Sequence, residues 1–277
     1  MTDLALAALF AVFIWWFSTG LILLLDNLPR GTFRWSLVIS SVVAVFALVG
    51  LAHTAGLSSM AGTYCAFTCA LLAWGWHELS FLTGWVTGPR QQALQPGAVG
   101  WPRFVQAVRA ILWHELAILA VGVLIVALTW GEPNQTGTAT FLVLWAMRTS
   151  AKLNLFFGVR NLSEEFLPPH LTYLQTYFRR RAMNGFFPVA VALACAVLAW
   201  LVVQAVDDST PPVQALGLTL VGTMLALAIL EHALLVLPVN ATALWRWAMR
   251  QRKEHPAPTV PPRPLAEEEA VHFAIVR

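Results

Sequence analysis

Residues 60–83, which read MAGTYCAFTCALLAWGWHELSFLT, decide the fold of this protein. The stretch is apolar and exceeds the roughly 20 residues that a helix needs to cross a bilayer. It nevertheless carries His77 and Glu78 close to its end. Ionisable side chains in hydrocarbon are costly, so by default they mark a functional site. The sequence therefore predicts a membrane helix that contains part of a site.

Composition supports a membrane protein along the whole chain. Of the 277 residues, 58% are hydrophobic and 11% are charged, whereas a soluble domain has about 25% charged residues. The net charge of +3 does not predict nucleic-acid binding, because the position of basic residues matters more here than their sum. We expect a polytopic protein whose main surroundings are the lipid bilayer.

Seven apolar stretches are each close to the length of a membrane span. They are residues 4–25, 35–54, 60–83, 106–129, 138–157, 186–206 and 213–237. Lys and Arg follow the first, third, fifth and seventh stretches and are absent from the other three loops. By the positive-inside rule this predicts an N-out, C-in topology. The expected fold is thus an all-α bundle of seven transmembrane helices over residues 1–253, followed by a disordered cytoplasmic tail at 254–277.

Residues 170–181 suggest one further element between the fifth and sixth spans. Leu171, Leu174, Tyr177 and Phe178 recur at helical spacing, and the segment ends in three arginines. A basic amphipathic helix of this kind commonly lies on a membrane surface. We therefore expect an amphipathic helix on the inner surface.

Three His–Glu pairs fall within these apolar stretches. Helical rise places the pairs about 8 to 12 Å from the inner edge, so we expect one polar layer in the inner leaflet. The fifth span adds polar residues at a similar depth. Two of them, Arg148 and Lys152, are four residues apart and so share one helix face. The pairs are His77–Glu78, His114–Glu115 and Glu231–His232, and the supporting polar residues are Arg148, Lys152 and Asn154.

Three interpretations of this layer remain open. The six His and Glu side chains are the ligand types that bind iron, manganese or zinc, although the Glu-x-x-His spacing of di-iron bundles is absent. Alternatively, His77, His114 or His232 binds the magnesium of a bacteriochlorophyll-type pigment, or a haem iron. The third interpretation is an ion network, in which the glutamates are neutralised by Arg148, Lys152 and the histidines.

One long stretch carries a family resemblance. Residues 152–184, KLNLFFGVRNLSEEFLPPHLTYLQTYFRRRAMN, together with the segments 76–79 and 87–90, resemble photosynthetic complex assembly protein 2, the PuhE family. The similarity extends through all seven predicted spans and ends before the proline-rich tail. It implies a multi-pass protein of a bacterial inner (cytoplasmic or intracytoplasmic) membrane. It also implies a link to photosynthetic complex assembly and bacteriochlorophyll supply. The resemblance assigns no catalytic or binding residue.

Two functions are therefore expected from the sequence. The first is a non-enzymatic assembly or pigment-handling factor, whose partners are reaction-centre or pigment-synthesis proteins. The second is a metal-dependent membrane oxidoreductase that acts on a pigment or isoprenoid precursor. No P-loop, GxSxG, HExxH or GxGxxG motif is present, so no catalytic residue can be named.

Overall fold

The computed structural model describes residues 2–237 together with 245, 247 and 248. This part of the chain is all-α, as predicted. Its seven α-helices are α1 (Thr2–Asp26), α2 (Phe33–Ala55), α3 (Met60–Leu82), α4 (Gly100–Thr129), α5 (Thr136–Phe157), α6 (Phe186–Val206) and α7 (Pro212–Val236). Three 3₁₀ segments accompany them, η1 (Arg30–Thr32), η2 (Glu164–Phe166) and η3 (Pro169–Tyr177). The predicted tail at 254–277 lies outside the described residues.

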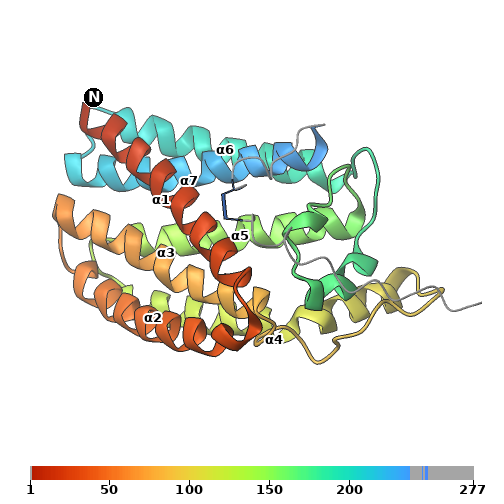
Figure 1. Ribbon diagram of the computed structural model, residues 1–277. Coiled ribbons are helices and arrows are strands. Elements are labelled where there is room, and N and C mark those ends of the chain that lie inside the picture. The colour runs from red at the N-terminus through yellow and green to blue at the C-terminus, as the bar shows by residue number, and fades with distance from the viewer. Residues whose placement is uncertain (1, 238–244, 246, 249–277) are drawn as a thin grey trace, which may run out of the picture.

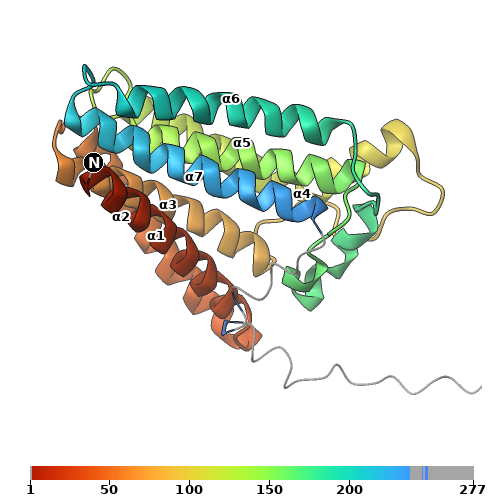
Figure 2. The same cartoon turned by 90° about the horizontal axis from the view of Figure 1, so that it is seen from above.

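The helices run side by side and alternate in direction, so their connections gather at two ends (Figures 1 and 2). One end holds the N-terminus of α1 and the short loops that follow α2, α4 and α6. The other end holds the longer loops after α1, α3 and α5, including η2 and η3. The arginines in loops belong to this second end, which we call the basic end: Arg30, Arg90, Arg160, Arg179, Arg180 and Arg181.

Five helical segments are long and apolar enough to cross a membrane: α1, η1 with α2, α4, α6 and α7. The protein is accordingly a multi-pass membrane protein. The other two long helices, α3 and α5, carry Glu78, Arg148 and Lys152. Of the 23 residues of α3, 14 are buried, because α1, α2, α5 and α7 pack around it. Helix α3, which carries His77 and Glu78, is therefore surrounded by the other helices of the bundle.

The loop after α3 packs against the middle of α4 and forms hydrogen bonds with it. A Cβ atom on Gly88 would lie 2.2 Å from the carbonyl oxygen of Arg109, so only glycine permits this approach. On either side, the Arg90 N–H donates to the Arg109 carbonyl (3.2 Å) and the His114 N–H donates to the Thr87 carbonyl (2.9 Å). These bonds fix the position of α4 at the residue that carries the second predicted histidine.

The prediction of an amphipathic helix at 170–181 is wrong about the type of helix and about what its apolar face contacts, while its position on the inner surface stays a prediction. The segment forms the 3₁₀ helix η3, which ends at Tyr177, and its apolar side chains are buried inside the protein. Leu171, Leu174 and Tyr177 recur every three residues, which is the period of a 3₁₀ helix rather than an α-helix. They pack against Phe81, Leu82 and Ala110 of α3 and α4. The apolar face therefore covers the end of the bundle instead of lipid.

Candidate functional site

The two histidines of the repeated Trp-His-Glu-Leu tetrads meet between α3 and α4. The ring centroids of His77 and His114 are 6.5 Å apart, and each residue is 1% exposed. Aromatic rings enclose the pair: Trp74, Trp76, Phe81 and Phe141. In the described part of the chain, none of the four ring nitrogens has a hydrogen-bond partner. Two polar rings thus lie among aromatic side chains and form no hydrogen bond with described residues. We call the two imidazoles and the four rings around them the His77–His114 chamber.

The two glutamates of the tetrads bind cations from α5. Arg148 Nη2 lies 2.9 Å from Glu78 Oε2, and Lys152 Nζ lies 2.6 Å from Glu115 Oε1. The four-residue spacing that places Arg148 and Lys152 on one helix face explains why both can reach these partners. The interpretation as an ion network named these cations and glutamates. The second oxygen of Glu78, Oε1, is buried without a partner among the described residues.

The reversed pair on α7 has different partners. Nδ1 of His232 lies 2.9 Å from the Ala228 carbonyl oxygen, and its Nε2 lies 2.9 Å from Ser150 Oγ. Because a carbonyl only accepts, Nδ1 must carry the proton and Nε2 accepts from the serine hydroxyl. The exposed Glu231 accepts a hydrogen bond from Trp15 Nε1 (3.0 Å). Both ring nitrogens of His232 are therefore engaged, unlike those of the first two histidines.

Helix α5 joins all three pairs. Arg148, Ser150 and Lys152 contact α3, α7 and α4 respectively, so the three pairs lie along one short stretch of this helix. Asn154 has another role, because its side-chain oxygen accepts from Asn184, whose own oxygen accepts from the first N–H groups of α6. Asn154 thus anchors the start of α6 rather than completing the layer.

The six predicted ligands do not converge on one point. Among the described residues, no group of three or more His, Cys, Asp or Glu side chains is placed to hold a metal ion. Glu78 and Glu115 face cations, Glu231 faces an indole, and His232 is bonded to protein atoms on both sides. What remains available for a ligand is His77, His114 and the free oxygen of Glu78.

The unpartnered atoms of His77, His114 and Glu78 are able to bind a ligand. A buried polar atom without a partner costs about 1 to 3 kcal/mol, and native proteins contain few of them. Imidazole nitrogens can bind a metal ion, a water molecule or the polar group of a ligand. The His77–His114 chamber is therefore the strongest candidate for a binding site within the layer.

Sequence reasoning missed two residues of this arrangement, Ser150 and Trp15. Ser150 had a usable signal, since it lies midway between the two cations on a helix already assigned to the layer. Trp15 had none, because its contact with Glu231 joins residues 216 positions apart. Such a contact depends on how α1 packs against α7.

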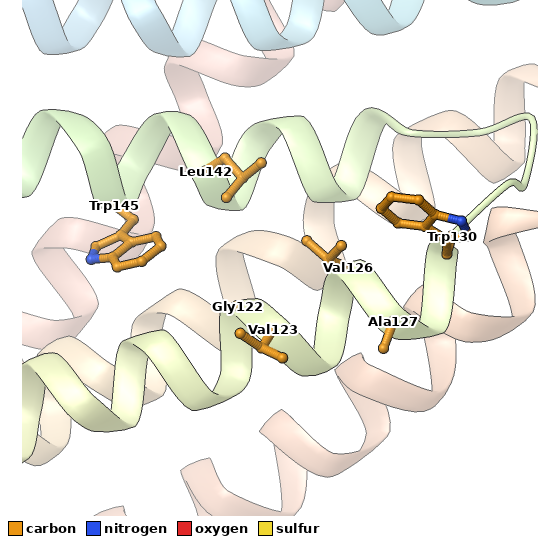
Figure 3. Close-up of a pocket in the computed structure, with 7 residues that line it drawn as sticks. All are labelled: Gly122, Val123, Val126, Ala127, Trp130, Leu142 and Trp145. Carbon is orange, nitrogen blue, oxygen red and sulfur yellow. The ribbon is translucent and has the colours of Figure 1, made fainter.

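A separate apolar groove lies between α4 and α5, nearer their connecting loop (Figure 3). Its volume is about 420 Å³ and none of its lining side chains is charged. It is lined by Gly122, Val123, Val126, Ala127, Trp130, Leu142 and Trp145. It contains no residue of the His/Glu layer, so the groove and the chamber are distinct features.

Comparison with known proteins gives two relationships. Residues 1–256 match the family described as "Protein of unknown function (DUF3623)". An "Uncharacterized 30.4 kDa protein in puhA 5'region" of Rhodobacter capsulatus is 38% identical over 259 residues, which cover 92% of this chain and 94% of that protein. No solved structure matches the chain. The chain therefore belongs to the DUF3623 family.

Proposed function

We propose that this protein is an assembly factor of the PuhE type, which supports construction of the bacterial photosynthetic complex or its supply of bacteriochlorophyll. The observation that carries the proposal is the 38% identity, over nearly the whole of both chains, to the protein from the puhA region. The resemblance of residues 152–184 to photosynthetic complex assembly protein 2 points in the same direction. Its partners are then reaction-centre or pigment-synthesis proteins in the bacterial inner membrane.

The proposal includes a topology of seven spans, N-out and C-in. Five helical segments have the length and hydropathy of membrane spans. We add α3 and α5, whose lengths of 23 and 22 residues suffice to cross a bilayer. Glu78 of α3 pairs with Arg148 of α5, and Lys152 of α5 pairs with a glutamate of α4. The arginines of the loops gather at one end, which supports a cytoplasmic position for the basic end.

The His/Glu layer is the proposed working part of the molecule. Paired ions inside a bundle fix the relative positions of the helices that carry them, because breaking one pair leaves an uncompensated charge. Here the pairs connect α3 and α4 to α5 around the His77–His114 chamber. The layer would hold this chamber in shape for a pigment or for a polar group of a partner.

Genetic complementation tests this function. In the host bacterium, deletion of the gene for this chain should lower the near-infrared absorption of the photosynthetic complexes in isolated membranes. Wild-type protein should restore the absorption, whereas Glu115→Gln should restore it only in part. Unchanged absorption in the deletion strain would contradict the proposal.

A matched control distinguishes the effect of disrupting the His/Glu layer from the general effect of losing a carboxylate. Glu132→Gln makes the same chemical change at an exposed position in the loop between α4 and α5. It should complement fully when membrane levels, measured by immunoblot, equal those of the wild type. Equal failure of both variants would remove the layer from the mechanism.

A second candidate function rests on the unpartnered ring nitrogens of His77 and His114. In a metal-dependent oxidoreductase acting on a pigment or isoprenoid precursor, these nitrogens would supply two protein ligands to iron, manganese or zinc. Elemental analysis of purified protein distinguishes the two candidates. Stoichiometric metal that disappears in both His77→Phe and His114→Leu would favour the enzyme. Co-purified pigment without metal would favour the assembly factor.

A further inference from the structure

The basic end contains a polar pocket built from residues outside the His/Glu layer. Its volume is about 210 Å³, and it lies between the start of α2, the end of α3 and η3. Its polar lining residues are Arg30, Thr83, Gln91, His170 and Tyr173. No Asp or Glu belongs to this lining within the described part of the chain. The pocket therefore has the charge balance of an anion site.

One wall of the pocket is held in place by His170. Its Nε2 lies 2.7 Å from the Leu82 carbonyl oxygen at the end of α3, so this nitrogen carries the proton. Gly84 stands beside the ring with a φ of +82°, and an added Cβ atom would lie 3.0 Å from it. Glycine satisfies both the backbone conformation and the close approach. The ring and the end of α3 thus form a fixed wall.

A second wall carries a hydroxyl group that lacks a well-formed hydrogen bond. The Tyr173 hydroxyl is buried and has no partner of good geometry among the described residues. It lies near Thr87, whose hydroxyl accepts from the Gln91 amide at 3.0 Å. Burial raises the pKa of the Tyr173 phenol, while the Thr87 hydroxyl acts in the opposite direction. The phenol therefore keeps its proton at neutral pH and can donate a hydrogen bond to a ligand oxygen.

Arg30 provides the charge. In the part of the chain that the structure describes, no carboxylate forms an ion pair with it. Two exposed tryptophans are close in sequence to residues that line the pocket: Trp35 lies at the start of α2, and Trp85 follows the end of α3. Exposed tryptophans at helix ends mark the headgroup level of a membrane. An unpaired guanidinium at this level is suited to a phosphate group, which it can bind through two parallel hydrogen bonds.

We propose that this pocket binds an anionic phosphate group, with the Arg30 guanidinium and the Tyr173 hydroxyl as donors. The source is the headgroup of an acidic phospholipid or free phosphate, and both present the same oxygen atoms. The proposal does not depend on a role in photosynthesis. Its lipid form depends on the placement of the basic end at a membrane surface.

Binding to the delipidated full-length chain in a neutral detergent tests the proposal. Three probes are titrated separately: short-chain phosphatidylglycerol, short-chain phosphatidylcholine and inorganic phosphate. The better of the two anionic probes should bind about tenfold more weakly to Arg30→Gln, because a charge-assisted bidentate contact is lost. Arg34→Gln is the matched control, since Arg34 lies over the Trp35 ring and does not line the pocket. Its affinity should equal that of the wild type.

The probes also identify the source of the phosphate. Tighter binding of phosphatidylglycerol than of inorganic phosphate assigns a lipid headgroup, and the reverse order assigns free phosphate. The proposal is overturned if no probe binds, if phosphatidylcholine binds as tightly as the better of the two anionic probes, or if Arg34→Gln loses as much affinity as Arg30→Gln. Tyr173→Phe removes one hydroxyl without changing charge, and it should weaken binding severalfold. It decides the outcome if Arg30→Gln does not fold.

Discussion

The repeated tetrads on α3 and α4 and the reversed pair on α7 contain the same ionisable residue types but have different partners. In the tetrads each glutamate pairs with a cation of α5, and the two histidines lie together without partners. In the reversed pair the glutamate accepts from an indole, and the histidine is bonded on both sides. The difference shows that a shared depth does not create a shared site. The side chains that neighbouring helices present decide which groups remain available.

The largest effect is expected from Lys152→Met, which leaves Glu115 without its cation. Removing one partner of a buried pair costs about 3 to 5 kcal/mol, and the partial exposure of these side chains (19% and 27%) reduces this to roughly 2 to 3 kcal/mol. The free energy of unfolding can be measured by SDS titration in mixed micelles. Lys152→Met combined with Glu115→Gln should recover more than half of the loss. A cost below about 0.5 kcal/mol for the single variant would mean that the pair is not a structural contact.

A moderate effect is expected on the other side of α5. His232→Leu breaks the bond to Ser150 and should lower the free energy of unfolding by about 1 kcal/mol, since it leaves a half-buried hydroxyl unpaired. In a double-mutant cycle with Ser150→Ala the two losses should not add, because both variants remove the same contact. Strict additivity would show that the two side chains do not interact in the protein.

A smaller effect distinguishes the two kinds of glutamate. Glu231→Gln should change the free energy of unfolding by less than about 0.5 kcal/mol, because the amide oxygen still accepts from Trp15. The same change at Glu115 removes the charge that faces Lys152, so it should cost several times more. Equal losses in the two variants would erase the contrast between the tetrads and the reversed pair.

The smallest effect is expected for His114→Leu in protein stripped of metal and pigment. Both ring nitrogens are buried without partners, so an apolar side chain of similar size should be neutral or stabilising, within about 1 kcal/mol of the wild type. The thermal unfolding midpoint in detergent reports the change. A clear loss of stability in the stripped protein would show that the imidazole is satisfied by the protein itself, and the chamber would then lose its claim as a ligand site.

The sequence allowed the helices to be predicted better than their contacts. Each predicted apolar stretch coincides with one of the long helices to within a few residues, because length and hydropathy are local properties. The cations at 148 and 152 were also correctly placed on one face, since helical spacing fixes this. The segment at 170–181 was misjudged because its period of three was taken for an α-helix, and the face that it covers belongs to distant helices.

By itself, the sequence determined an all-α membrane protein with arginines in alternate loops, and it predicted a layer of three His–Glu pairs. These properties follow from composition, helical rise and charge along a single chain. Only the tertiary structure decided that His77 and His114 meet, that Glu78 and Glu115 bind cations and that His232 is engaged with Ser150. Contacts between helices depend on how each helix is rotated about its axis. That rotation is set by packing against all of its neighbours at once, which no local pattern encodes.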